Sequence, residues 1–388
     1  MHSENRILTT HVGSLIRPPA LIAVLERLYT GEDVPELQTM LDSAVADIVR
    51  KQGANGIDIV SDGEFSKCYT WSQYIIERLE GFERRLLDPG TAFTTIRGKD
   101  YEDFKEFYDK YEEAEGPAGL GKSIKPSVLA VTGPLRYRDA EVKADIARFK
   151  RALEGVDAAG AFLPVVAPAS VAPNRKDEYY KSDEEFLFAL AGELNKEYRA
   201  IVEAGLIVQV DDAFMATHYD VIGDFDTYRK WAELRVEALN RALQGVPEER
   251  SRYHLCWGSW NGPHTNDIEL KRIVGLVLGI KVGSYAIEMA NPRHEHEWRV
   301  WKDVKIADGK VLIPGVVSHC TNVVEHPELV AERIVRLARL VGRENVIAGS
   351  DCGFAQGPFG QRVHPTIMWA KLRAIAEGAA IATRGLWK

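Results

Sequence analysis

The sequence predicts an α/β fold, a single (β/α)8 barrel of the TIM type that spans residues 1–388 as one domain. Short β-branched runs alternate with segments of helical periodicity, and this alternation indicates a parallel sheet. The length suits a barrel of roughly 250 residues with insertions. An open doubly wound sheet is the alternative, but no G-x-G-x-x-G motif follows the first strand.

Nine segments have the composition of strands, whereas a closed barrel of this type needs eight. The first, residues 7–14, runs into a Gly-Ser turn, and the second is residues 57–60. One of the nine is therefore not a barrel strand, and either residues 127–132 or residues 162–167 are the ones to exclude. The remaining candidates are residues 206–210, 253–257, 284–287, 311–316 and 346–349.

Helical periodicity separates most of these strands. We expect helices at residues 21–28, 34–51, 181–204, 226–244, 268–278, 326–342 and 364–380. Residues 86–125 break the alternation, because they are rich in charge and aromatic side chains and end in a Gly-rich stretch, residues 116–121. We interpret them as an insertion with a helix and a loop, which is either a lid or a solvated decoration.

Composition excludes several classes of protein. The net charge of −8 argues against a nucleic-acid partner, and no apolar run is long enough for a membrane span. The N-terminus lacks a basic region followed by an apolar run, so we expect no secretory signal. Four cysteines are too few for a disulfide scaffold and suit free thiolates in a reducing cytoplasm.

The stretch Tyr253-His254-Leu255-Cys256-Trp257 carries the strongest chemical signal. In a β-strand, residues two apart point to the same face, so His254 and Cys256 lie together. An imidazole and a thiolate on one face supply half of a tetrahedral Zn²⁺ site. The alternative is that Cys256 acts as a small buried hydrophobic side chain.

Further polar side chains stand where other predicted strands end, which is where a barrel carries its function. If their strands are neighbours, Glu288 and Cys352 can join His254 and Cys256 around one metal. For Asp62 and Asp351 the alternative is a capping role. The complete set of polar residues at strand ends is His11, Ser14, Asp62, Glu64, Asp211, Asp212, His254, Cys256, Glu288, His319, Asp351 and Cys352.

The remaining metal-ligating residue types receive a different interpretation. Cys68 and Cys320 stand apart from the predicted ligand set. His294 and His296 occupy a charged run, and we expect this run to form a solvated loop rather than a second metal site.

Six motifs in a fixed order resemble the catalytic half of cobalamin-independent methionine synthase and its short single-barrel relatives, which include epoxyalkane:coenzyme M transferase. The resemblance runs from about residue 7 to about residue 380 and implies Zn²⁺ bound by His254, Cys256, Glu288 and Cys352. The motifs are Thr9-Thr10-His11-Val12-Gly13-Ser14, Asp62-Gly63-Glu64, Val208-Gln209-Val210-Asp211-Asp212, His254-x-Cys256, Ile287-Glu288 and Ser350-Asp351-Cys352-Gly353.

The resemblance also implies roles in substrate binding. The backbone of Gly13 and Ser14 would hold the carboxylate of homocysteine, and Glu64 and Asp211 would hold its amino group. His319 would transfer a proton.

The chain departs from the methionine synthase pattern at two of the motifs. His11 stands where that family has threonine, and Ala213 follows Asp211-Asp212 where it has proline after Asp-Glu. These changes put folate as the methyl donor in doubt. His319 or His11 could protonate a leaving group, and with Asp211 these are the predicted catalytic residues.

The sequence thus predicts a transferase, a zinc-dependent thiol alkyltransferase of the S-methyltransferase kind. Its partners would be a small thiol, homocysteine or a related one, and an alkyl or methyl donor. The alternatives are the opening of an epoxide by a thiol such as coenzyme M, a metal-free lyase like uroporphyrinogen decarboxylase, and a non-catalytic zinc-binding module. The sequence leaves open the donor, which could be folate, a corrinoid protein or an epoxide, and the formation of a homo-oligomer.

Overall fold

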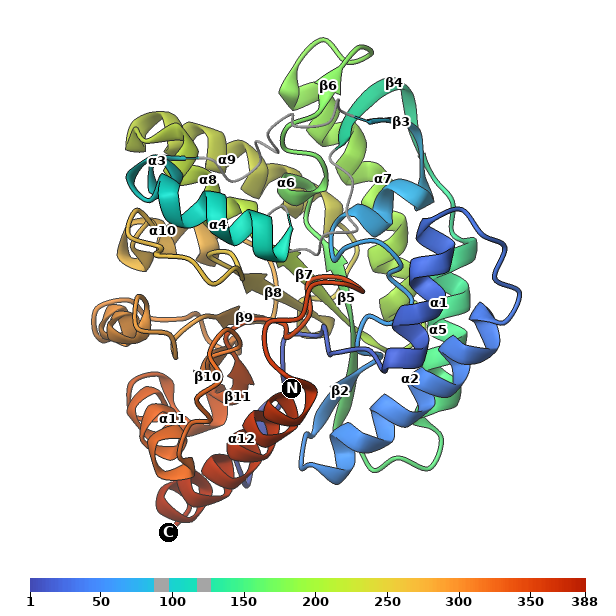
Figure 1. Ribbon diagram of the computed structural model, residues 1–388. Helices are drawn as coiled ribbons and strands as arrows, with labels where there is room; N and C mark the ends of the chain where they lie inside the picture. The colour runs from blue at the N-terminus through green and yellow to red at the C-terminus, as the bar shows by residue number, and fades with distance from the viewer. Residues whose placement is uncertain (87–97, 117–126) are drawn as a thin grey trace.

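Eight parallel strands form a nearly closed barrel in the computed structural model, which describes residues 1–86, 98–116 and 127–388 (Figure 1). Around the barrel they follow the order β1-β11-β10-β9-β8-β7-β5-β2, which confirms the predicted fold class. The strands are β1 (Leu8–Thr9), β2 (Ile59–Ser61), β5 (Gly160–Val166), β7 (Ile207–Asp212), β8 (Ser251–Leu255), β9 (Ser284–Ile287), β10 (Val311–Val317) and β11 (Ile347–Ser350).

The barrel closes between its two shortest strands, β1 and β2. The Asp58 amide donates to the Thr9 carbonyl at 3.1 Å, and the Thr10 hydroxyl donates to the Ile59 carbonyl at 3.0 Å. The Asp58 carboxylate accepts from the Thr9 amide at 2.9 Å. Hydrogen bonds that involve side chains thus complete a ring that the other strands form by regular pairing.

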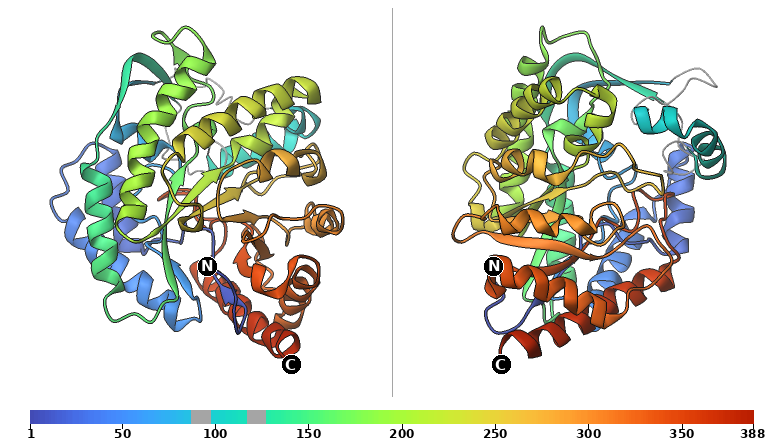
Figure 2. Two further views of the ribbon diagram at one scale, coloured as in Figure 1. Left: turned by 180° about the vertical axis from the view of Figure 1, so that it is seen from behind. Right: turned by 90° about the vertical axis from the view of Figure 1, so that its left-hand side faces the viewer.

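Helices surround the barrel, and each predicted helix is present with boundaries shifted by a few residues (Figure 2). Two helices of 14 and 9 residues, α5 (Ala140–Leu153) and α8 (Phe214–Ile222), were not predicted. Ser182 caps the start of α7, where its side chain accepts from the Glu185 amide. The helices are α1 (Pro19–Tyr29), α2 (Leu37–Ala54), α5 (Ala140–Leu153), α6 (Pro168–Val171), α7 (Asp183–Glu203), α8 (Phe214–Ile222), α9 (Phe225–Ala242), α10 (Leu270–Leu278), α11 (Pro327–Val341) and α12 (Pro365–Leu386).

The sequence left open whether residues 127–132 or residues 162–167 are not a barrel strand. In the structure, residues 127–132 lie outside the barrel. They belong to β4 (Ser127–Tyr137), which pairs antiparallel with β3 (Leu79–Leu86) and parallel with β6 (Lys176–Asp177). Residues 162–167 belong to the barrel strand β5. The strand β3 was not predicted, because its sequence is largely charged and its pairing partner lies some forty residues later.

The predicted insertion contains two short helices, α3 (Lys99–Asp103) and α4 (Lys105–Glu115), in the part that the structure describes. In the right-hand view of Figure 2 they lie at the end of the barrel away from the N-terminus. Most of the Gly-rich stretch falls at residues 117–121, outside the described residues. No described helix is long and apolar enough to cross a membrane.

Two helical glycines with different surroundings, one packed against a neighbouring helix and one exposed, test the helix packing. A methyl group on Gly378 of α12 would lie 2.4 Å from Cγ1 of the buried Val330 on α11, whereas one on Gly192 of α7 would meet nothing within 4 Å. We expect Gly378→Ala to cost about 1–3 kcal/mol through overpacking. Gly192→Ala should instead stabilise the protein by up to about 1 kcal/mol through helix propensity. Urea unfolding of both variants measures the change in the free energy of unfolding. Equal changes in the two variants would contradict the packing of α11 against α12.

Candidate active site and metal centre

A cavity of about 410 Å³ lies where the barrel strands end. Strand ends and the loops that follow them supply most of its wall, as expected for a barrel of this type. Val128 and Leu129 of β4 and Phe214 of α8 add apolar surface. The predicted site residues in the wall are Ser14, Glu64, Asp211, His254, Cys256 and Cys352.

Three of the four predicted metal ligands come together in this wall. His254, Cys256 and Cys352 each offer a ligand atom, and these atoms lie within 4.8 Å of one another. The two sulfur atoms are 3.4 Å apart, although 96 residues separate them in the chain. All three side chains are buried. Cys256 directly follows β8 and Cys352 lies two residues after β11, so the strand ends bring them together at one end of the barrel, although β9 and β10 lie between the two strands.

The electrostatics of this cluster suit a cation that binds sulfur and nitrogen. Burial lowers the pKa of His254 to about 3, so its imidazole is neutral, as a metal ligand must be. Neither of its ring nitrogens makes a hydrogen bond of normal geometry to the described residues. The hydrogen bond with Cys352, and then burial, raise the pKa of Cys256 well above its usual value. Two sulfurs and one free imidazole form a donor set that fits Zn²⁺.

The fourth predicted ligand, Glu288, lies beside this cluster in a second group with His319 and Asp351, whose ligand atoms are also within 4.8 Å of one another. Its carboxylate accepts from the Trp257 amide at 2.9 Å and from the Asn291 side chain at 2.8 Å. Burial raises the pKa of Glu288. Its charge also contributes to raising the pKa of Cys256, which places Glu288 near the thiols.

Asp351 is more than a turn cap. One oxygen accepts from the amides of Met289 and Ala290, both at 2.8 Å, and the other has no hydrogen-bond partner among the described residues. Burial, and then the charge of Glu288, raise the pKa of Asp351 to about 8. Asp351 and Glu288 thus form a pair of buried carboxyl groups that can share a proton near neutral pH.

His319 stands against this carboxyl pair. Burial, and then the charge of Arg362, lower the pKa of His319 to about 3. Neither ring nitrogen has a hydrogen-bond partner in the described parts of the chain. His319 is not part of the cavity wall, but its neutral imidazole lies beside two carboxyl groups with which it can exchange a proton.

The residues predicted to hold a substrate amino acid also converge. A methyl group on Gly13 would lie 2.8 Å from Oε1 of Glu64, so these residues are in contact. Glu64 has a φ of 61°, a strained value for a residue with a side chain. Burial, and then the charge of Glu64, raise the pKa of Asp211 well above its usual value.

Sequence reasoning had not assigned Lys67 to this group. Its Nζ lies 2.9 Å from Oε2 of Glu64, and both side chains are buried. The spacing Glu64-x-x-Lys67 was the available signal, because residues three apart can pair where the chain turns. The ion pair leaves Glu64 less negative toward a ligand than an isolated carboxylate would be.

His11 takes a different position from the one its predicted catalytic role needs. Its Nδ1 accepts from the Gly13 amide at 3.0 Å, and Nε2 therefore donates to Oε1 of Gln52 at 2.7 Å. Burial lowers the pKa of His11 to about 4. The ring is not part of the cavity wall. His11 shapes the turn at Gly13, and a part in protonating a leaving group has no geometric support.

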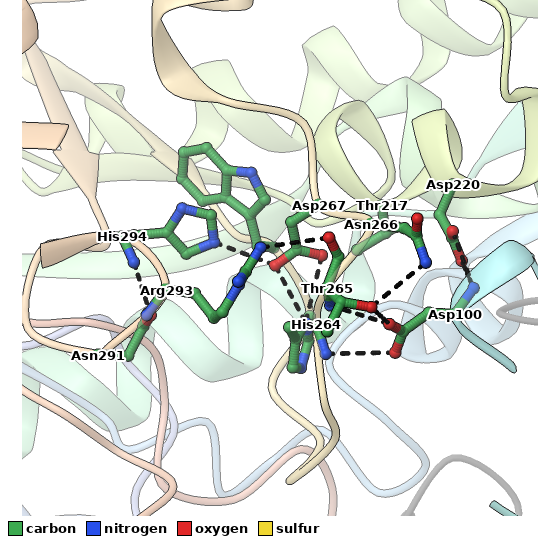
Figure 3. Close-up of polar contacts among 12 residues, drawn as sticks. Asp100, Thr217, Asp220, His264, Thr265, Asn266, Asp267, Asn291, Arg293 and His294 are labelled. Carbon is green, nitrogen blue, oxygen red and sulfur yellow. Dashed lines mark hydrogen bonds and ion pairs between the residues drawn. The ribbon is translucent and has the colours of Figure 1, made fainter. Parts of the chain in front are cut away.

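The expectation of a solvated loop around His294 is wrong. His294 is buried, with its Nε2 3.0 Å from Asp267 and its Nδ1 2.8 Å from Glu297. Figure 3 shows Asp267 between His294 and His264. The ring of His294 also packs on Trp257, with centroids 4.3 Å apart. The two carboxylates compensate the cost of burying the ring, a pairing that the linear sequence did not reveal.

The loop after β8, which carries Asp267, also holds the helices of the insertion. Oδ1 of Asp100 on α3 accepts from the amide and hydroxyl of Thr265, at 2.9 and 2.7 Å (Figure 3). Oδ2 accepts from the Tyr108 hydroxyl at 2.7 Å, which in turn accepts from Nε1 of Trp260 at 3.0 Å. Trp260 lines the cavity, so α3 and α4 are docked beside its wall. Whether they act as a lid remains a prediction.

Comparisons with known proteins bear out the resemblance. No family model matches the chain. A methionine synthase from Thermococcus kodakarensis is 25% identical, with 97% of this chain and 94% of that protein covered. A 2-hydroxypropyl-CoM lyase from Xanthobacter autotrophicus is 23% identical, with 98% and 96% covered. The resemblance to cobalamin-independent methionine synthases and their short relatives is thus confirmed.

A solved structure supports the fold. The B12-independent methionine synthase from Shewanella sp. W3-18-1 superimposes with a TM-score of 0.73 at 21% identity, covering 98% of this chain and 99% of that one. Both kinds of named relative are enzymes, which supports an enzyme of the thiol-alkylating type.

The ion pairs of His294 predict a pH-dependent stability. Burial opposes its charge, but Asp267 and Glu297 outweigh burial and raise the pKa of His294 from 6.5 to about 10. The folded protein binds this proton more tightly, so the stabilisation is complete below pH 6.5 and is lost as the pH rises toward 10. We expect the stability difference between wild type and His294→Gln to shrink by roughly 1 kcal/mol per pH unit in this window.

Urea unfolding at pH 6.5 and pH 9 measures the effect, with the exposed His296 of the same segment replaced by Gln as the control. A difference that does not change with pH would show that His294 is neutral in the folded protein.

Proposed function

We propose that the protein is a zinc-dependent thiol alkyltransferase that acts as one catalytic domain over residues 1–388. The observation that carries the proposal is the convergence of His254, Cys256 and Cys352 in the cavity wall. These residues would hold the metal, with Glu288 of the second group as the fourth ligand. Zn²⁺ held there would lower the pKa of a substrate thiol while leaving the sulfur nucleophilic.

The chain's own residues would orient the thiol. We propose homocysteine or a related amino-acid thiol, which agrees with the relatives named methionine synthase. The turn at Gly13 and Ser14 would bind its carboxylate, with the Ser14 amide as the donor because the Gly13 amide already donates to His11. Glu64 and Asp211 would accept hydrogen bonds from its ammonium. The alignment of sulfur with the electrophilic carbon would supply much of the rate.

We propose that the group of Glu288, His319 and Asp351 transfers a proton during the reaction. When the sulfur attacks, a C–S bond forms and the bond to the leaving group breaks, so the leaving group departs with the electron pair. His319 would supply a proton to that group, and Asp351, which can hold a proton while Glu288 binds the metal, would replenish it. Asp211 would act mainly through binding.

Opening of an epoxide by a thiol is the second candidate function. The 2-hydroxypropyl-CoM lyase relative, which matches 98% of the chain, favours it. In that reaction the sulfur attacks an epoxide carbon, the C–O bond breaks, and the resulting alkoxide takes a proton. The same cavity and the same His319 would serve both reactions.

Metal content tests the proposed centre. We expect about one equivalent of zinc per chain in protein purified without chelators, because two thiolates and an imidazole converge. Cys256→Ser with Cys352→Ser should lose it, because serine is a poor zinc ligand. Cys68→Ser, outside the cluster, is the matched control. Elemental analysis decides: zinc-free wild type would favour the metal-free lyase, and full retention in the double variant would show that the zinc is bound by other residues.

Thiol binding tests the chemistry. Homocysteine should release close to one proton per site near neutral pH, because a free thiol has a pKa of about 8.5 and the bound form is a thiolate. Calorimetric titration in two buffers of different ionisation enthalpy measures the proton, and zinc-edge spectra should gain one sulfur neighbour. Homoserine, with oxygen in place of sulfur, is the control. Homocysteine binding without proton release would leave a structural zinc site and refute the alkyltransferase.

A further inference from the structure

Arg84 on β3 stands behind one part of the cavity wall and binds two polar side chains of that wall. Its Nη1 donates to Oε1 of Gln73 at 2.9 Å and to the Ser127 hydroxyl at 3.2 Å. Gln73 and Ser127 line the cavity, whereas Arg84 does not. One guanidinium therefore brings together two wall residues that come from different segments, one before β3 and one at the start of β4.

This contact fixes which atoms of the two side chains remain available to a ligand. A guanidinium has five donors and no acceptor, so Gln73 must turn its carbonyl oxygen to Arg84 and its NH₂ group away. The Ser127 oxygen also accepts from Arg84, which leaves the hydroxyl proton to be donated. Neither remaining donor has a partner among the described residues. Both wall residues are thus set as donors toward the cavity.

Thr70 follows the same pattern beside them. Its hydroxyl accepts from the Gln73 amide at 3.0 Å, which again leaves a proton to donate. The Trp71 amide donates to the Gln356 carbonyl at 3.2 Å, and Gln356 belongs to the loop that carries Cys352. All five residues line the cavity. The row of donors therefore shares one cavity with the metal ligands and is joined to the loop of one of them.

The surroundings of these donors indicate what they would bind. Nη2 of Arg84 lies 3.8 Å from the Glu77 carboxylate, a separation longer than a hydrogen bond. Donors that are bonded to a cation are polarised and bind an acceptor more strongly. Val128 and Leu129, which follow Ser127 on β4, add apolar wall next to the donors. An apolar ligand that carries an oxygen acceptor fits this arrangement.

We propose that Gln73 and Ser127, oriented by Arg84, bind an oxygen acceptor, a carbonyl or a carboxylate, on the apolar body of the second substrate. The assignment of that ligand as the alkyl or methyl donor rests on the proposed function, whereas the acceptor site itself depends on geometry alone. The thiol site proposed around Glu64 uses a different part of the wall, so the two substrates would bind side by side.

Two small aromatic probes test the site without the natural substrates. Benzoate carries oxygen acceptors on an apolar ring, whereas benzylamine is a cation at neutral pH and can only donate. Ligand-observed NMR with the protein as purified, at pH 7, would give the dissociation constant of each probe. Wild type should bind benzoate, and a wild type that does not bind it would overturn the acceptor site.

We expect Gln73→Glu to weaken the binding of benzoate by roughly tenfold or more. The new carboxylate would still accept from Arg84, but it replaces a donor by a negative acceptor that repels benzoate. Benzylamine should bind as in wild type or more tightly. Ser127→Ala removes one neutral donor without adding charge and should weaken benzoate by about twofold to tenfold.

Gln38→Glu is the matched control. Gln38 also accepts from an arginine, with its Oε1 2.6 Å from Nη2 of Arg148, but neither residue is part of the cavity wall. The same substitution at this site should leave the binding of both probes as in wild type.

Unchanged benzoate binding in Gln73→Glu would overturn the acceptor site. An equal loss of both probes would also overturn it, because Gln73 would then shape the wall without selecting an acceptor. Either result would leave the proposed function standing if the protein still holds zinc and releases a proton on binding homocysteine. A selective loss of benzoate in a protein that binds neither zinc nor homocysteine would instead support the acceptor site and refute the proposed function.

Discussion

A buried guanidinium, that of Arg252 on β8, holds the inside of the barrel together beneath the cavity. It donates to Gln209 on β7 at 2.6 Å, to Thr10 at 3.1 Å and to the His11 carbonyl at 2.9 Å, and it lies 3.4 Å over the ring of Phe162 on β5. These contacts join strands from opposite sides of the ring. A hydrogen bond to a charged group contributes about 1.5–3 kcal/mol, so the positions of the strand ends depend on this arrangement.

Above that layer, Asp351 fixes the half of the barrel that carries the metal ligands. Its Oδ1 binds the amides that follow β9, and a methyl group on Gly315 of β10 would lie 2.0 Å from the same oxygen. Only glycine admits the carboxylate there. The ends of β9, β10 and β11 are thereby locked together, and Cys352, the next residue along the chain, is held 3.4 Å from Cys256.

Local patterns predicted those parts of the site that depend on a single strand. Alternation placed His254 and Cys256 on one face, and the convergence of strand ends at one end of a barrel brought Cys352 to them, although β9 and β10 separate β8 from β11. Other features depend on side chains packed between distant segments. The sequence could not show that two carboxylates surround His294 or that Arg84 holds two polar side chains of the cavity wall. The strand β3 was missed for the same reason, because its pairing with β4 outweighs a charged composition.

Groups with an unfavourable free energy, namely unpaired buried nitrogens and a strained backbone, lie at the end of the barrel that holds the cavity. The buried nitrogens of His254 and His319 make no hydrogen bond in the described structure, and each such group costs about 1–3 kcal/mol. Glu64 adds a strained backbone. The opposite end is filled by aliphatic side chains and Phe162, with no such cost in the described structure. A ligand that binds His254 in the folded state recovers part of this free energy, so the stability of the fold and occupancy of the site are coupled.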